Sequence, residues 1–241
     1  MSDKGKIIAI YLSVAVICAV AIAGFIFLRT ARHAGVEATT DAEAFRDAGA
    51  GEPPVLNVLT SDLEVVNQTG EKVRLSELDD KVWVVNQFFA NCPVCAKQNY
   101  GDMISIYKEF KDHPDFHLVS ITVDPERDTP ELLEGYAEAV GASSDNWWFL
   151  TGEKAELYRY LSEEMKFTPT KENPEAVGEK RFAHDFGVQV YGRDRRLVRV
   201  RDLVSGRAIS EEEHKRRMDA LRERIALRLA EPLPEDLEVQ P

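Results

Sequence analysis

Two cysteines, Cys92 and Cys95, stand between a run typical of a buried strand and a run typical of a helix. Residues 82–89 (VWVVNQFF) are mostly β-branched and aromatic, which is typical of a strand that is buried on both faces. Apolar residues then recur at helical spacing between residues 100 and 110. The Cys-x-x-Cys motif is therefore predicted to lie at the junction between a central strand and the start of a helix.

This position suits two kinds of chemistry. The partial positive charge at a helix N-terminus favours a thiolate, so Cys92 is predicted to attack a disulfide and Cys95 to resolve the mixed disulfide. The same two thiolates are soft ligands that favour Cu(I), although two sulfurs do not complete a metal site. A purely structural disulfide is the third interpretation, but a bridge that closes so short a loop stabilises a fold only slightly.

Composition excludes several other classes of protein. The third cysteine, Cys18, is far from the pair, so neither a disulfide-rich miniprotein nor a closed four-cysteine zinc site can be built. The formal net charge is -12, which disfavours a surface that binds the phosphate backbone of nucleic acids.

Residues 7–28 are a run of 22 residues without a charge. As a helix this run would extend roughly 33 Å, enough for the bilayer core of about 30 Å. Basic residues follow it directly at Arg29 and Arg32, without a small-residue cleavage site, which favours an uncleaved transmembrane helix over a signal peptide. Because Lys4 and Lys6 precede the run, basic residues alone do not decide its orientation.

Strands and helices alternate through the remaining sequence, which predicts an α/β fold. Thr129 followed by Pro130 is typical of a helix start. The other predicted elements are short strands around a turn within residues 55–77, a strand at 116–123, a helix at 130–140, a strand at 147–150, a helix at 153–164, a polar loop at 168–181, a hairpin of strands at 188–191 and 197–201, and a last helix after Ser210.

Residues 120–130 (SITVDPERDTP), followed by Tyr136 and by residues 148–152 (WFLTG), resemble the signature region of the Sco/SenC family. The resemblance extends over about residues 54–202. It implies a thioredoxin-like fold, in which helices flank a central mixed sheet, and a copper ion, Cu(I) or Cu(II), held by Cys92, Cys95 and His184. Taken alone, His184 could equally be an ordinary surface histidine.

The resemblance also implies a location and a partner. Members of the family are membrane-anchored and linked to cytochrome c oxidase assembly, so the soluble domain is expected on the periplasmic side of the cytoplasmic (inner) membrane. The expected organisation is a cytoplasmic N-terminus (1–6), a transmembrane anchor (7–28), a tether (29–53), a Sco/SenC domain (54–231) and a tail (232–241). The expected partner is oxidase subunit two or another respiratory thiol protein.

This sequence departs from the family pattern at the cysteines. The family usually has three residues between them, whereas only Pro93 and Val94 intervene here, and Ala96 stands where a proline is common. The shorter spacing is that of thioredoxins and favours thiol–disulfide exchange. A copper chaperone for the oxidase and a thiol–disulfide oxidoreductase without a copper role therefore both remain open, as does a binding module whose cysteines only lock their loop.

Other polar residues are predicted to be structural. His33, His113, His117 and His214 have no cysteine or carboxylate at metal-ligand spacing. Asp124 and Asp128 are predicted to form a turn and to cap the helix that starts at Pro130, and Arg127 to pair with a neighbouring carboxylate.

Overall fold

The chain is described by a computed structural model, which covers residues 56–90, 99–176, 178 and 181–232. Contacts divide the chain into two units, Met1–Pro53 and Pro54–Pro241, and all described residues belong to the second unit. The predicted anchor at residues 7–28 and the two cysteines of the motif lie outside the described residues. Within the described ranges no helix is long and apolar enough to cross a membrane.

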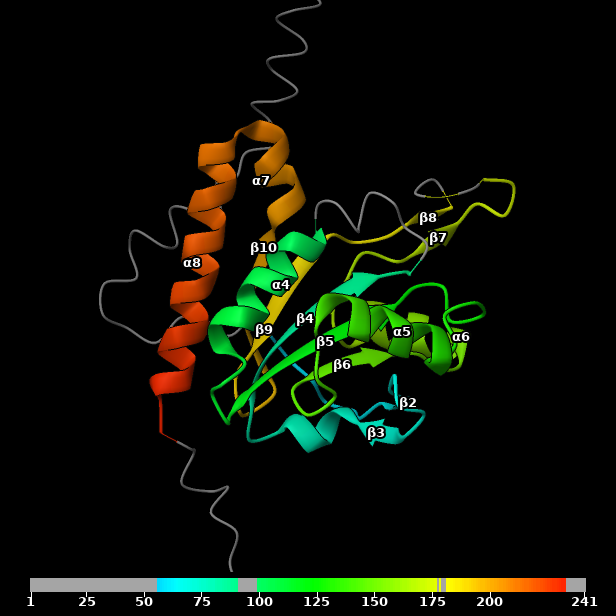
Figure 1. The fold of residues 1–241 in the computed structure, drawn as a ribbon, viewed down its shortest axis with the longest axis horizontal. Coiled ribbons are helices and arrows are strands. Elements are labelled where there is room, and N and C mark those ends of the chain that lie inside the picture. The colour runs from blue at the N-terminus through cyan, green and yellow to red at the C-terminus, as the bar shows by residue number, and fades with distance from the viewer. Residues whose placement is uncertain (1–55, 91–98, 177, 179–180, 233–241) are drawn as a thin grey trace, which may run out of the picture. The chain divides into compact units, whose positions relative to one another are not determined.

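A six-stranded mixed sheet forms the centre of the domain (Figure 1). Its strands, in spatial order, are β1 (Asn57–Val58), β10 (Arg196–Asp202), β9 (Gly187–Tyr191), β4 (Val82–Phe88), β5 (Phe116–Thr122) and β6 (Trp147–Leu150). The strands β4, β5 and β6 run parallel, whereas β9 is antiparallel to β4 and to β10. Every residue of β4 and β5 is buried, as their apolar runs predict.

Two short hairpins accompany the sheet. One is formed by β2 (Glu64–Val66) and β3 (Lys72–Arg74), around the turn predicted within residues 55–77. The other pairs β7 (Lys171–Glu172) with β8 (Phe182–Ala183). The prediction of a polar loop at residues 168–181 is therefore wrong in part, because Lys171 and Glu172 pair with the strand that begins just after this segment.

Helices cover both faces of the sheet (Figure 1). They are α4 (Asn99–Phe110), α5 (Pro130–Val140), α6 (Lys154–Glu163), α7 (Leu203–Ile209) and α8 (Glu211–Ala230), with a 3-10 turn, η1 (Leu75–Leu78). Thr129 caps α5 as predicted, its side chain accepting from the backbone N–H of Leu132. The sequence interpretation missed α7, which starts where the Asp202 side chain accepts from the N–H of Ser205 at 2.8 Å.

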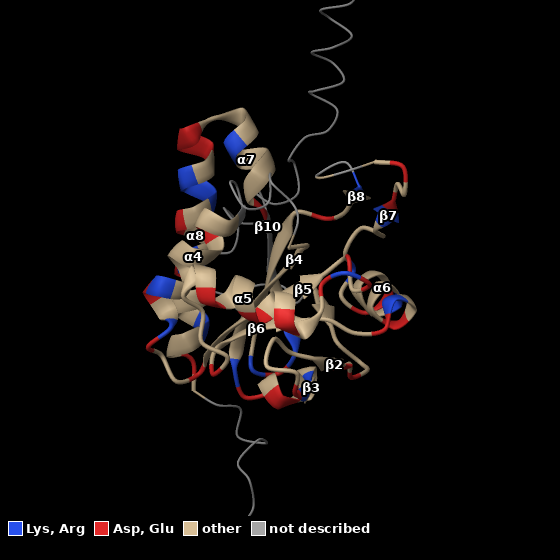
Figure 2. Cartoon of the chain, turned by 45° about the vertical axis from the view of Figure 1, so that its right-hand side comes forward, with Lys and Arg blue, Asp and Glu red and all other residues tan. Residues whose placement is uncertain are grey.

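The last helix, α8, starts as its sequence predicts. The Ser210 hydroxyl accepts from the N–H of Glu213 at 3.0 Å, while the Glu213 carboxylate pairs with Arg216 and Arg217. Acidic and basic residues both occur along the length of this helix (Figure 2). Its apolar side is buried against the sheet through the four predicted core residues, Met218, Leu221, Ile225 and Leu229.

The two faces of the sheet carry separate apolar clusters. On one face α4, α5 and α8 pack on alternate strand residues, among them Val84, Leu118 and Val190. On the other face α6, η1 and the β2–β3 hairpin pack on Val85 and Ile121. Because successive side chains of a strand point to opposite faces, the all-buried strands β4 and β5 supply both clusters.

His117 lies on β5 and is buried, as a structural role predicts. Its ring centroid is 4.4 Å from that of Trp148, and its Nε2 has no hydrogen-bond partner. Burial, with a smaller contribution from the charge of Lys81, lowers the pKa of His117 from 6.5 to about 3.

We expect this burial to make the domain acid-sensitive. Because the folded pKa lies below the unfolded value, His117 favours folding above pH 6.5 and loses this contribution as the pH falls toward 3. When the pH is lowered from 7 to 4, the free energy of unfolding should fall in both proteins, but by about 3 kcal/mol less in His117→Leu than in wild type. Urea unfolding at both pH values measures the difference, and equal losses in the two proteins would contradict the prediction.

Candidate functional site

The candidate site lies where β4 ends and the chain enters residues 91–98, which contain Cys92 and Cys95. Those two side chains lie outside the described residues. The described part of the site consists of the end of β4, the loop after β5, and the segment between β8 and β9.

His184 lies in the three-residue segment between β8 and β9. In the antiparallel pair of β4 and β9, Asn86 is opposite Val188. Extending this register by four residues brings His184 level with Ala90, two residues before Cys92. The rings of Phe89 and His184 are 5.9 Å apart, which agrees with that placement. The fold therefore brings His184 to the end of β4, after which the cysteines follow in the sequence. Along the chain His184 is 92 positions from Cys92 and 89 positions from Cys95.

The imidazole of His184 is held in one tautomer. It is 8% exposed, so it is not the ordinary surface histidine that the sequence alone left open. Its Nδ1 lies 2.8 Å from the backbone oxygen of Asp185. Since a carbonyl oxygen can only accept, Nδ1 carries the hydrogen, and the lone pair of the neutral ring is on Nε2. Burial lowers the pKa of His184, which favours the neutral form that ligates metals.

Asp185 fixes the backbone around His184. One carboxylate oxygen accepts from the N–H of Gly187 at 2.7 Å, and the other accepts from the N–H of Thr168 at 2.8 Å. The Asp185 N–H donates in turn to Oε1 of Gln87 on β4, at 3.1 Å. The sequence interpretation missed this residue. The signal that could have found it is the Asp-x-Gly spacing, because an aspartate often accepts from the N–H two residues on.

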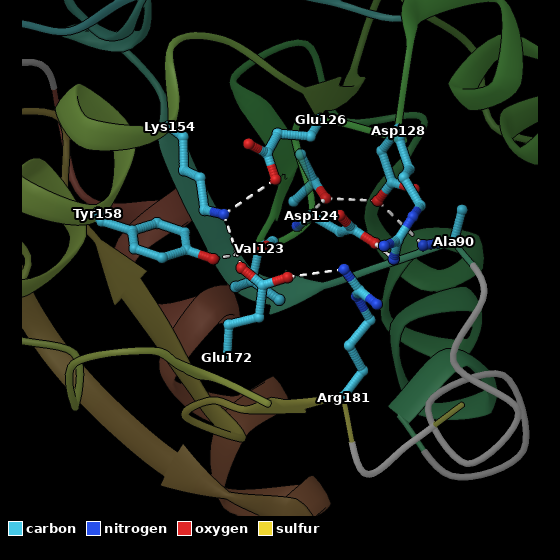
Figure 3. A network of polar contacts seen from close by, with 11 residues as sticks. Ala90, Val123, Asp124, Glu126, Asp128, Lys154, Tyr158, Glu172 and Arg181 are labelled. Carbon is cyan, nitrogen blue, oxygen red and sulfur yellow. Dashed lines mark hydrogen bonds and ion pairs between the residues drawn. The ribbon is translucent and has the colours of Figure 1, made fainter. Parts of the chain in front are cut away.

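Asp128 connects the loop after β5 to the end of β4 (Figure 3). Its Oδ2 accepts from the N–H of Ala90 at 3.1 Å and from the hydroxyl of Thr122, whose oxygen accepts from the N–H of Asp124 at 2.9 Å. Burial raises the pKa of Asp128. Asp124 turns the chain as predicted and pairs with Arg127 at 2.9 Å. The predicted capping role of Asp128 is wrong, because Thr129 caps α5 and Asp128 binds a strand that is distant in sequence.

A small apolar cluster lies beside this network. It contains Phe89, Val123 and Phe182, with Phe186 packed against it. Phe89 contacts Phe182 edge-on at 5.2 Å between ring centroids, and His184 lies 4.6 Å from the ring of Phe186. The cluster therefore joins the ends of β4 and β5 to the β7–β8 hairpin, and the rings of Phe89 and Phe186 lie beside His184.

Within the described ranges no three His, Cys, Asp or Glu side chains are grouped so that they could hold a metal ion. Of the predicted ligands, only His184 is in those ranges. The set of Cys92, Cys95 and His184 therefore stays a prediction, because both cysteines lie outside the described residues.

Comparisons with known proteins agree on one family. The family model described as SCO1/SenC matches residues 53–218. The SCO1 protein homolog of Bacillus subtilis (strain 168) is 30% identical over 146 residues, which are 60% of this chain and 74% of that protein.

Two solved structures are similar in fold. The SCO1/SenC family lipoprotein from Bacillus anthracis str. Ames has a TM-score of 0.58 and 21% identity, covering 71% of this chain and 96% of that chain. Bradyrhizobium japonicum ScoI with copper bound has a TM-score of 0.56 and 20% identity, covering 70% of this chain and 99% of that chain. The fold is thus the thioredoxin-like fold of these proteins, and, since the family model matches more than half of its length, the chain belongs to the SCO1/SenC family.

Proposed function

We propose that this chain binds a copper ion through Cys92, Cys95 and His184 and delivers it to cytochrome c oxidase during assembly. The observation that carries the proposal is the placement of the His184 imidazole beside the end of β4, the strand that precedes the cysteines. The ring is neutral and has its lone pair on Nε2. Support also comes from the copper-bound ScoI of Bradyrhizobium japonicum and from the description of the Sco family as cytochrome c oxidase assembly proteins.

The donor set suits a cargo that must be bound and then released. The two thiolates are soft ligands that favour Cu(I), an imidazole nitrogen also ligates copper, and the cysteines lose their protons when the ion binds. The Nδ1–H bond to the Asp185 carbonyl orients the ring and raises the basicity of Nε2. Transfer then proceeds by exchange of these ligands for the thiols of the receiving protein.

We also propose a location on the membrane. The uncharged run at residues 7–28 supports a single transmembrane anchor, with the domain on the periplasmic side of the inner membrane. In that arrangement the tether would let the copper site approach the soluble part of an oxidase subunit.

A cellular experiment tests the delivery role. Cells of the source organism that lack this chain are expected to lose most cytochrome c oxidase activity and to regain it with the wild-type gene. The His184→Ala gene should fail at ordinary copper levels, and His113→Ala, a change of a histidine outside the site, should succeed. Full oxidase activity in cells without the chain, or full rescue by His184→Ala, would contradict copper delivery.

The two-residue spacing of the cysteines favours a second candidate function, the reduction of a disulfide in a partner, such as one formed between the copper-site cysteines of the oxidase. In that case the Cys92 thiolate attacks the partner's disulfide and releases one partner thiol, and Cys95 then attacks the mixed disulfide, which releases the second thiol and leaves Cys92 and Cys95 joined as a disulfide. The Cys95→Ser variant is then expected to trap a partner in a mixed disulfide that dithiothreitol releases, and His184→Ala should leave the trapping unchanged. The absence of any trapped species would count against this candidate.

A further inference from the structure

The segment that contains His184 follows the β7–β8 hairpin, which is too short to be stable without contacts to the rest of the domain. The strands β7 and β8 pair over only two residues each, Lys171 with Ala183 and Glu172 with Phe182. An isolated two-stranded hairpin is at best marginally stable in water, so contacts with the body of the domain must keep β7–β8 in place. His184 directly follows β8, so those contacts also govern where His184 lies.

One set of these contacts is ionic and centres on Glu172 (Figure 3). One carboxylate oxygen of Glu172 lies 2.7 Å from Nζ of Lys154, in the first turn of α6, and the other lies 2.7 Å from Nη2 of Arg181, just before β8. Lys154 also pairs with Glu126, in the loop after β5, at 2.9 Å. The side chains of Glu172 and Arg181 are each 19% exposed, so water and salt screen the pair between them only in part.

The ionic contacts act on the same strand pair as the apolar ones. Glu172 is directly opposite Phe182, whose ring packs edge-on against Phe89 at 5.2 Å. The guanidinium of Arg181 lies over the Phe182 ring at 5.5 Å. The ion pairs of Glu172 with Lys154 and Arg181 therefore stabilise the hairpin at the position of Phe182, which packs on the end of β4.

We propose that Glu172 is a positioning residue for the copper site: its pair with Lys154 holds β7–β8 against α6, its pair with Arg181 ties β7 to the start of β8, and together they keep His184 at the end of β4. The inference rests on the proposed function, since it assigns Glu172 a task only if His184 is a ligand. Glu172 lies outside the sequence signature of residues 120–130, 136 and 148–152, in a segment that the sequence predicted to be a polar loop.

Hydrogen exchange of the reduced, copper-free full chain tests the structural half of this inference. In Glu172→Gln the amides of Asn173, Asp185 and Gly187, which donate to Arg181, Gln87 and Asp185, should exchange about five- to tenfold faster, since two charge-assisted pairs are lost. The matched control is Glu213→Gln, which removes a doubly paired carboxylate on α8 and should leave these amides unchanged.

Salt gives an independent check of the ionic contacts. In wild type 1 M NaCl should accelerate exchange of the same amides, because the screening length falls to about 3 Å. In Glu172→Gln this acceleration should be absent. Equal exchange in Glu172→Gln and wild type, or an equal effect of salt on both, would overturn the role of Glu172 in holding the hairpin.

The positioning half is tested by the ¹⁵N chemical shifts of the His184 ring in the same copper-free samples and by Cu(I) affinity. Glu172→Gln should shift the ring nitrogens toward an average of the two tautomers and weaken Cu(I) binding about three- to tenfold. Faster exchange with unchanged ring shifts would overturn positioning. If wild type and His184→Ala bind Cu(I) equally, the proposed function fails, while hydrogen exchange and ring shifts still decide the role of Glu172.

Discussion

Replacement of Asp128 by alanine is expected to lower the unfolding free energy of the domain by about 2–3 kcal/mol. The carboxylate is 1% exposed and accepts from the Ala90 N–H at 3.1 Å and from the Thr122 hydroxyl. Alanine would leave both donors without this acceptor, at the point where β4 leads into the residues that carry the cysteines. The loss is larger than for most single substitutions because two hydrogen bonds to a charged group are lost, one from Ala90 and one from Thr122.

The matched control is Asp128→Asn, which keeps the size of the side chain and one accepting oxygen. Among the described residues Oδ1 of Asp128 has no partner, so an amide nitrogen in its place breaks no existing bond, and the loss should be about 1 kcal/mol smaller than in Asp128→Ala because both bonds are kept and only the charge is removed. Urea unfolding followed by tryptophan fluorescence measures both variants. An Asp128→Ala domain as stable as wild type would show that the Ala90 and Thr122 bonds do not stabilise this loop.

Most of the central sheet could be predicted from the sequence because its signals are local and strong. The apolar runs at residues 82–89 and 116–123 correspond to β4 and β5, and the Thr129–Pro130 helix start was confirmed. The elements that were missed, the β7–β8 hairpin and α7, have weak local signals. A two-residue strand has no periodicity to detect, and the hairpin depends on contacts with α6 and β4.

The candidate site was less predictable than the sheet. His184 was identified only by resemblance to a family, since nothing in its neighbourhood marks it as a ligand. Asp128 was correctly expected to be structural, but its partner at Ala90 is 38 positions away. Glu172 and Asp185 bind residues on other elements, Lys154 and Gln87, and a single sequence contains no signal for such contacts.

Replacement of His184 by alanine is expected to weaken Cu(I) binding by about 100-fold or more. Changes to groups that merely orient a metal ligand typically cost 10–100-fold in affinity, so removal of the ligand itself should cost at least as much. The fold should tolerate the change better than the metal site does, because Asp185 still binds Gln87, Gly187 and Thr168. His113→Ala removes a histidine from outside the site and should bind Cu(I) as wild type does.

The most direct test of the copper site is a Cu(I) competition titration of the reduced full chain against a chromophoric chelator, for wild type, His184→Ala and His113→Ala. We expect one tightly bound copper ion in wild type and in His113→Ala, and an affinity at least about 100-fold lower in His184→Ala. Equal affinities in wild type and His184→Ala would contradict the three-ligand site and favour thiol–disulfide exchange by Cys92 and Cys95.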